Sequence, residues 1–181
     1  GGTGFIGHHL LRAARQRGWQ ITSISLNPPS SQRLVDNVRY VHFDLTDLEI
    51  AKKYLEETFD YVVNLGGYIN HQLFKDGGRT MIKTHFNSLQ NLVEVIPRDR
   101  LKRFVQIGSS SEYGLLKAPH KENLKCKPIS IYGKSKLLSS AYLVKLFKEK
   151  KFPVTILRFY QVYGPKQDLN RFLPVVISGC L

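Results

Sequence analysis

Tyr132 and Lys136 are the two residues whose types and spacing are best suited to chemistry. A separation of four positions places two side chains on one helical face, about 5–6 Å apart at Cβ. A phenol with a pKa of about 10 is a weak base at neutral pH, but a neighbouring ammonium favours the phenolate. The pair is therefore suited to exchanging a proton with a substrate hydroxyl while a hydride leaves or reaches the same carbon. A surface Tyr–Lys pair without a function is the alternative.

A serine-rich turn precedes this pair, where an apolar segment runs into Ser109, Ser110 and Ser111 and then Glu112. A serine hydroxyl at the end of a strand can hydrogen-bond a reacting oxygen and orient it. Such a turn also occurs without any function.

Three glycines at the start of the chain form a second candidate site. Gly1, Gly4 and Gly7 stand three apart and precede a helical pattern. Glycine lets the backbone approach a pyrophosphate, and the N–H groups of the following helix point at that anion. A plain structural turn is the alternative.

Both candidate sites lie among alternating strand and helix patterns, which predict βαβ units and a parallel sheet. The expected class is α/β, as a doubly wound, Rossmann-like parallel sheet. The expected strands are Ile21–Leu26, Val38–Phe43, Tyr61–Leu65, Phe104–Ile107 and Val154–Leu157. The expected helices are Phe5–Arg17, Leu48–Thr58, Thr80–Val95 and Ile131–Lys150, with Asp47 or the preceding 44–46 stretch as a cap and Pro97 closing the third.

Composition excludes several classes of protein. The chain has 181 residues with 42% hydrophobic residues, which is typical of one folded domain rather than a disordered chain. No apolar run is long enough for a membrane span. The two cysteines provide no zinc spacing and suit a reducing, cytoplasmic setting, so we expect no metal. The net charge of +13 suggests nucleic acid, but the basic residues are scattered, and we expect no nucleic-acid partner.

The order of these motifs, over nearly the whole chain, resembles the NAD-dependent epimerase/dehydratase family of extended short-chain dehydrogenases/reductases. The resemblance implies NAD or NADP as cofactor, with the first Rossmann strand absent from this chain. It implies a cofactor-binding domain over 1–170, truncated at its N-terminus, and the start of a substrate domain at 171–181. The chain is thus expected to be a piece of a longer protein, and its own activity is open.

The implied cofactor residues are Gly1, Gly4, Phe5, Ile6, Gly7, Asp44, Leu45, Leu65, Gly66, Gly67, Tyr132 and Lys136. Asp44 alternatively serves as a helix cap.

The choice between NAD and NADP is open at this stage. In dinucleotide-binding folds an acidic residue after the second strand bonds the ribose 2′-OH, whereas a basic residue accepts a 2′-phosphate. No carboxylate follows this strand; Asn27 or Ser25 offers a hydrogen bond, and Arg33 lies in the next loop.

The resemblance also implies roles for individual side chains. Counting back from Gly114 assigns the catalytic hydroxyl to Ser109, which joins Tyr132 and Lys136. Ser109, Ser110, Gln161 and Arg171 are the implied substrate residues, although a surface salt bridge is an equal role for Arg171. His85 stands where the family usually has Asn, and a surface or core role is the alternative.

The expected activity is epimerisation at C4 of a nucleotide sugar. Dehydratases of the family usually have Asp-Glu directly after the catalytic hydroxyl, where this chain has Ser110 and Ser111. A 4-keto-sugar reductase, a 4,6-dehydratase and a non-catalytic dinucleotide sensor are the alternatives. The resemblance further implies a homodimer formed through the Tyr132 helix and a place in polysaccharide biosynthesis.

Overall fold

The computed structural model describes residues 1–67 and 78–180, which form two compact units. One unit contains residues 1–43 and the described residues from 161 onward; the other contains residues 44–160. Every strand pair in both units is parallel, which confirms the predicted Rossmann-like α/β class.

The first unit begins with helix α1 (Phe5–Gln16), followed by a two-stranded sheet of β1 (Thr22–Ser25) and β2 (Arg39–His42). A 3₁₀ turn, η1 (Ser31–Arg33), lies between the strands, and helix α6 (Phe172–Cys180) ends the unit. The residues that α1 buries recur at helical spacing: Gly7, His8, Leu11 and Ala14. The helix ends where Gly18 adopts a φ of +73°, a left-handed conformation that glycine adopts without strain.

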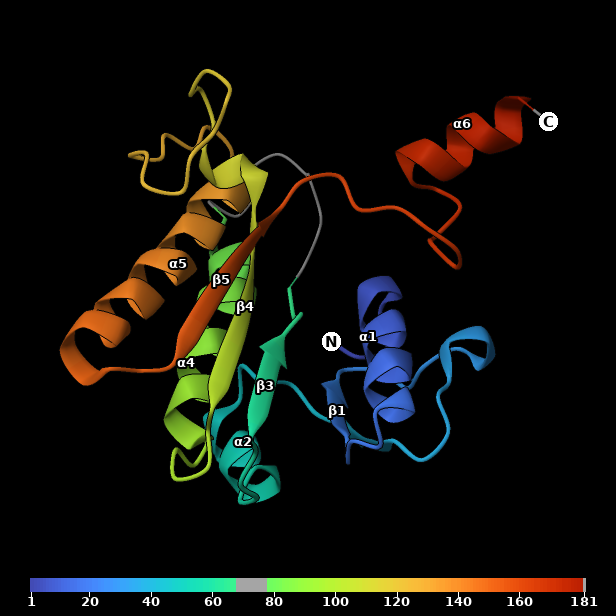
Figure 1. Ribbon diagram of the computed structural model, residues 1–181, viewed down its shortest axis with the longest axis vertical. Helices are drawn as coiled ribbons and strands as arrows, with labels where there is room; N and C mark the ends of the chain where they lie inside the picture. Colours follow the sequence, from blue (N-terminus) through green and yellow to red (C-terminus); the bar gives the residue numbers. More distant parts are fainter. Residues whose placement is uncertain (68–77, 181) are drawn as a thin grey trace. The chain divides into compact units, whose positions relative to one another are not determined.

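The second unit has a sheet of order β3-β4-β5, with helices α4 and α5 behind it in Figure 1. Its strands are β3 (Tyr61–Asn64), β4 (Arg103–Ser109) and β5 (Val154–Phe159). Its helical segments are α2 (Leu48–Tyr54), α3 (Arg79–Ile82), the π-helical η2 (Lys83–Asn87), α4 (Ser88–Val95), the 3₁₀ turn η3 (Ser110–Glu112) and α5 (Ile131–Lys150). The core is formed by side chains with almost no exposed surface, including Phe104, Leu89 and Leu143.

The predicted elements are all present, with informative differences at their ends. Helix α5 has the predicted bounds, and Asp47 caps α2 by accepting a hydrogen bond from the Ile50 N–H at 3.1 Å. Helix α2 ends at Tyr54, four residues before the predicted end. Two glutamates follow it, and negative charge is unfavourable at a helix C-terminus. The π-helical turn η2 and helix α6 were not predicted.

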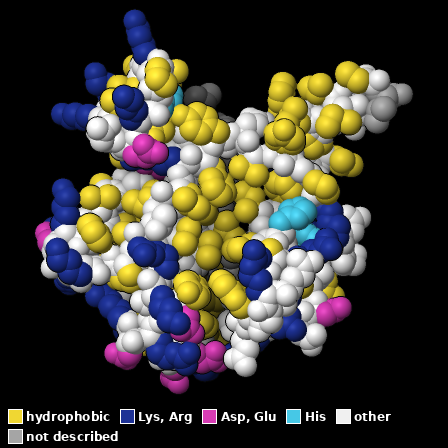
Figure 2. All heavy atoms as spheres, in the orientation of Figure 1, with side chains coloured by type: hydrophobic (Ala, Val, Ile, Leu, Met, Phe, Trp, Pro, Cys, Tyr) yellow, Lys and Arg dark blue, Asp and Glu magenta, His cyan; other side chains and the backbone are white. Residues whose placement is uncertain are grey.

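The surface of the described residues is mixed in character. Figure 2 shows Lys and Arg side chains spread over the visible face rather than gathered in one patch. Helix α6 exposes Phe172, Val175 and Ile177, each by more than half. Among residues 1–67 and 78–180, none of the helices combines the length and apolar character that a membrane span requires.

Helix α5 allows a direct test of the core. Leu143 is fully buried, whereas Leu138 on the same helix is 41% exposed. Leu143→Ala leaves a cavity and should lower the free energy of unfolding by about 3 kcal/mol. Leu138→Ala is the matched control and should change it little. Urea unfolding of the two variants measures the difference, and equal losses would contradict the assigned core.

Candidate active site

The serine turn at the end of β4 is closed by hydrogen bonds within its own residues. Ser109 is the last residue of the strand, and its Oγ accepts a hydrogen bond from the Ser111 N–H at 3.1 Å. The Ser109 N–H in turn donates to the Glu112 carboxylate at 2.9 Å, which completes a capping box. These bonds fix the backbone on both sides of the Ser109 hydroxyl.

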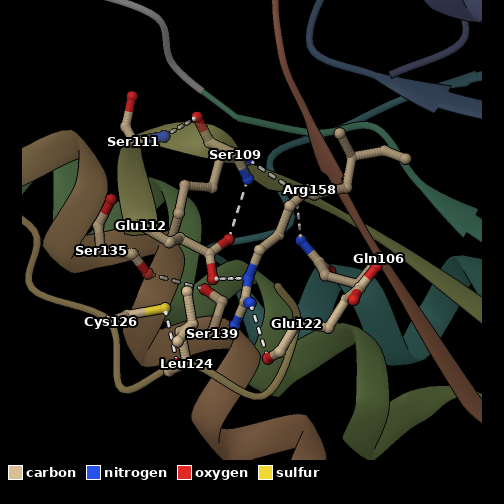
Figure 3. A network of polar contacts seen from close by, with 12 residues as sticks. Gln106, Ser109, Ser111, Glu112, Glu122, Leu124, Cys126, Ser135, Ser139 and Arg158 are labelled. Carbon is tan, nitrogen blue, oxygen red and sulfur yellow. Dashed lines mark hydrogen bonds and ion pairs between the residues drawn. The ribbon is translucent and has the colours of Figure 1, made fainter. Parts of the chain in front are cut away.

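The carboxylate of Glu112 joins this turn to the neighbouring strand. Glu112 has no exposed surface, and the Arg158 Nε–H of β5 donates to it at 2.9 Å. Figure 3 shows Arg158 and the Ser109 backbone converging on this carboxylate. Gly108 of β4 leaves room for the pair, since a Cβ there would lie 3.3 Å from the Arg158 Cγ. The only carboxylate of the turn is therefore engaged in holding the turn together.

Tyr132 reaches this turn from the first turn of α5. The hydroxyl of Ser130 caps the helix by accepting from the Gly133 N–H at 3.0 Å. Gly133 packs on the backbone of Ser111, so the start of α5 lies directly against the serine turn. Burial raises the pKa of Tyr132 above its ordinary value, a hydrogen bond with Ser109 opposes that rise, and the charge of Glu112 adds to it.

Lys136 lies one helical turn further along α5 and is only 6% exposed. Its Nζ donates to the Ile107 carbonyl of β4 at 3.1 Å and lies 5.8 Å from the centre of the Tyr132 ring. Burial lowers the pKa of Lys136 to about 8, against the opposing attraction of Glu112. The sequence suggests an ammonium that favours the Tyr132 phenolate, but burial is the larger influence on both groups.

His85, in the π-helical turn η2, also contacts Tyr132. The two rings meet edge to face at 5.5 Å, and the His85 Nδ1 forms a 2.8 Å hydrogen bond with the Ser135 hydroxyl. A Cβ on Gly67 would lie 2.9 Å from the His85 Nε2 and 3.4 Å from the Lys136 Nζ. His85 is therefore a buried residue of this cluster, not a surface residue.

The remaining cofactor candidates of the second unit lie at the ends of its elements. Asp44 is exposed and accepts from the Thr46 N–H at 2.8 Å, while the Leu45 carbonyl accepts from the Asn91 amide at 2.9 Å. Gly66 donates its N–H to the Asn64 side chain at 3.1 Å and follows Leu65 directly after β3. Asp44 thus forms a local turn beside the helix cap of Asp47.

The glycine turn belongs to the first unit and has the form expected of an anion site. Gly4 donates its N–H to the Gly1 carbonyl at 3.2 Å, and a Cβ on Gly7 would lie 2.6 Å from the Gly2 Cα. The first turn of α1, including Phe5 and Ile6, has no side-chain cap and no acidic residue. A tight glycine turn before an uncapped helix N-terminus fits a dinucleotide pyrophosphate.

The structure gathers some of the predicted site residues and not others. Ser109, Tyr132, Lys136 and Gly67 form one cluster in the second unit. Ser110 lies in the same serine turn, half-buried. Asn27, Gln161 and Arg171 belong to the first unit, with Asn27 and Gln161 exposed and Arg171 half-buried.

Two features of the site were not predicted from the sequence. The Glu112–Arg158 pair joins residues 46 positions apart, and its one sequence signal is Gly108, since a glycine inside a strand often marks a close approach. The contact between His85 and Ser135 joins two helices and has no local signal.

Breaking the Glu112–Arg158 pair should destabilise the second unit. Glu112→Gln leaves a partly buried guanidinium without its carboxylate, which should lower the free energy of unfolding by about 3 kcal/mol. The matched control is Glu49→Gln, which breaks an ion pair with Lys52 whose glutamate is 81% exposed. Thermal and urea unfolding measure both variants, and equal small losses would contradict the role of Glu112.

The shifted pKa of Lys136 predicts a pH dependence of stability. Between pH 8 and the ordinary value of 10.5, the unfolded chain still holds a proton that folded Lys136 has released. The free energy of unfolding should therefore increase with pH across this window because of Lys136. Urea unfolding at pH 7.5 and 9.5 should show a larger increase for the wild type than for Lys136→Met. An equal increase in the free energy of unfolding for the two proteins would contradict the lowered pKa of Lys136.

Comparison with solved structures shows the same fold in several enzymes. UDP-glucuronic acid 4-epimerase from Bacillus cereus, solved with NAD, is 26% identical with a TM-score of 0.83. The alignment covers 99% of this chain and 60% of the epimerase. UDP-glucose 4-epimerase from Thermotoga maritima is 24% identical with a TM-score of 0.84, covering 94% and 57%. A dTDP-glucose 4,6-dehydratase from Streptomyces venezuelae is 21% identical with a TM-score of 0.84, covering 99% and 60%.

These comparisons define both the extent of the chain and its family. The chain spans about 60% of the length of the structures that it resembles. The model of the NAD dependent epimerase/dehydratase family matches residues 1–181. With a family match over the entire sequence and the fold of its enzymes, this chain belongs to the NAD-dependent epimerase/dehydratase family.

Proposed function

We propose that this chain is the cofactor-binding part of an NAD(P)-dependent nucleotide-sugar 4-epimerase. The observation that carries the proposal is the cluster of Ser109, Tyr132 and Lys136 at the carboxyl end of β4. A dinucleotide sensor has no need of this combination of hydroxyl, phenol and ammonium. Family membership and the epimerases of like fold support the same conclusion.

The proposed mechanism assigns proton transfer to Tyr132. Bound NAD or NADP supplies the site that accepts and returns a hydride. The phenolate of Tyr132 takes the proton of the sugar 4-OH in the oxidation, and the phenol so formed returns a proton in the reduction. Ser109, already hydrogen-bonded to Tyr132, orients the reacting oxygen. The raised pKa of Tyr132 favours its neutral phenol, so the oxidation depends on the phenolate that the Lys136 ammonium stabilises.

Lys136 is proposed to support Tyr132 and to bond the ribose beside the nicotinamide. Its pKa of about 8 leaves it mostly protonated at neutral pH, so its ammonium stabilises negative charge that develops on the phenol. The Gly67 backbone lies directly against these side chains, since a Cβ there would lie 2.9 Å from the His85 Nε2 and 3.4 Å from the Lys136 Nζ. Their closeness to Lys136, the proposed ribose contact, supports Leu65, Gly66 and Gly67 as cofactor contacts.

Other residues are proposed to hold the two nucleotides. The glycine turn with Phe5 and Ile6 takes the pyrophosphate of the cofactor, and Asn27, Asp44 and Leu45 hold its adenosine. Ser110, Gln161 and Arg171 are proposed to contact the nucleotide sugar.

A dehydratase activity is disfavoured because the Glu112 carboxylate is already engaged. The positions directly after Ser109 hold Ser110 and Ser111, which are not acids or bases at neutral pH. The nearest carboxylate, Glu112, is buried, paired with Arg158 and bonded to a backbone N–H, so it is not available to remove water from a sugar. A 4-keto-sugar reductase needs the same three residues as an epimerase, and it is the second candidate.

The organisation of the whole protein is also proposed. Residues 1–170 form the cofactor domain and residues from 171 start the substrate domain. Val144 and Phe147 of α5 are each more than 40% exposed, which supports a homodimer formed through this helix. A cytoplasmic place in polysaccharide biosynthesis completes the proposal.

The role of Tyr132 is tested by removing its hydroxyl. Tyr132→Phe should lower turnover of the full-length protein by about 10³-fold, because proton transfer contributes that order of rate. Dinucleotide binding should persist, since the glycine turn is unchanged. Tyr142→Phe, on the same helix, is the control and should keep full turnover. A Tyr132→Phe protein as active as the control would refute the assignment.

The same assay, run with a panel of nucleotide sugars, separates the candidate functions. An epimerase converts the sugar without net change in NAD(P)H, whereas a reductase consumes NADPH in proportion to product. Dinucleotide binding without turnover of any sugar would support a sensor.

A further inference from the structure

Arg33 connects two loops of the first unit. It ends the turn η1 in the loop after β1, and its Nη2 donates to the Lys166 carbonyl at 2.7 Å and to the Asp168 carboxylate at 2.5 Å. Lys166 returns a hydrogen bond from its Nζ to the Gln32 carbonyl at 2.6 Å. The Arg33 side chain is only 18% exposed, so its guanidinium is engaged rather than extended into water.

This junction lies beside the glycine turn. The Arg33 carbonyl accepts a hydrogen bond at 2.9 Å from the Nδ1 of His8, the residue that follows Gly7. His9, the next residue of α1, bonds the Pro165 carbonyl at 2.9 Å through its Nε2. Residues 164–168 therefore lie along the first turns of α1, and Asp168 lies against Arg33 of the loop after β1. His8 is buried in this packing.

The loop after β1 is where a dinucleotide-binding fold distinguishes NAD from NADP. A carboxylate there bonds the ribose 2′-OH, and an arginine accepts a 2′-phosphate. Between Asn27 and Asp36, Arg33 is the only basic residue, and no carboxylate directly follows the strand. By sequence alone Arg33 leaves the choice between NAD and NADP open, whereas the structure pairs it with Asp168.

We propose that Asp168 is a specificity-determining residue that makes the protein select NAD over NADP by holding the Arg33 guanidinium. The inference rests on the proposed function, because it requires dinucleotide binding at the glycine turn. A 2′-phosphate has to displace the Asp168 carboxylate from Arg33 and then lies close to its negative charge. A ribose 2′-hydroxyl has neither cost.

The size of the effect follows from the exposure of the pair. Asp168 is 51% exposed, so water and salt weaken the attraction that a 2′-phosphate must overcome. Removing the carboxylate should therefore change NADPH affinity by about fivefold, the upper end for a partly exposed charged pair.

The test measures binding rather than turnover. Binding of NADH and NADPH to the full-length protein is followed by nucleotide fluorescence. The wild type should bind NADH more tightly than NADPH. Asp168→Asn should strengthen NADPH binding about fivefold and leave NADH binding unchanged. The double variant Asp168→Asn/Arg33→Gln should lose that gain, because Arg33 is the group that Asp168 releases.

Asp36→Asn is the matched control, since it removes the same charge from an exposed position in the same loop. Equal effects of Asp168→Asn and Asp36→Asn would overturn the inference by showing a general effect of net charge. Arg33→Gln provides a second route if Asp168→Asn does not fold, and it should weaken NADPH binding further. A wild type that binds NADPH more tightly than NADH would overturn this inference but not the proposed function. A protein that binds neither dinucleotide would overturn the proposed function as well.

Discussion

The candidate active site depends on one buried charge, the carboxylate of Glu112. A carboxylate with no exposed surface is stable only when it is paired and hydrogen-bonded, because the cost of removing it from water is several kcal/mol. Arg158 supplies the charge and the Ser109 backbone supplies a second hydrogen bond, so β4, β5 and the turn η3 must keep one arrangement. Gly108 provides the necessary space between the strands. The position of the Ser109 hydroxyl follows from this arrangement.

The packing of α5 on the serine turn then brings proton-transfer groups together. Gly133 allows the helix to approach the backbone of Ser111, and the next turn of the helix inserts Lys136 beneath Tyr132. The burial that excludes water has opposite effects on the two groups. It raises the pKa of a phenol and lowers that of an ammonium, since in both cases the charged form is disfavoured. The ammonium is the group that can stabilise the Tyr132 phenolate, which then accepts the substrate's proton.

In the first unit, too, a charged pair holds separate segments together, but this pair is less buried. The Arg33–Asp168 pair and the histidines of α1 tie the loop after β1 to residues 164–168. This pairing changes the meaning of a basic residue near a cofactor site, because a guanidinium already held by a carboxylate is a poor partner for a further anion. The net charge of +13 is therefore not a measure of the cations available to a ligand.

The sequence by itself determined the parallel α/β class, the order of the elements and the bounds of α5, because these depend on local periodicity and capping. Glycine spacing, the serine turn and the Tyr132–Lys136 spacing also lie within short segments, so each motif could be recognised from neighbouring residues. Only the tertiary structure decided that Glu112 is engaged with Arg158, that His85 is buried against Tyr132 and that Arg33 is held by Asp168. These partners lie between 46 and 135 positions apart, and no local pattern encodes which distant residue a side chain will meet. The sequence supplies the functional groups, whereas packing decides their partners and hence which of them are free to meet a ligand.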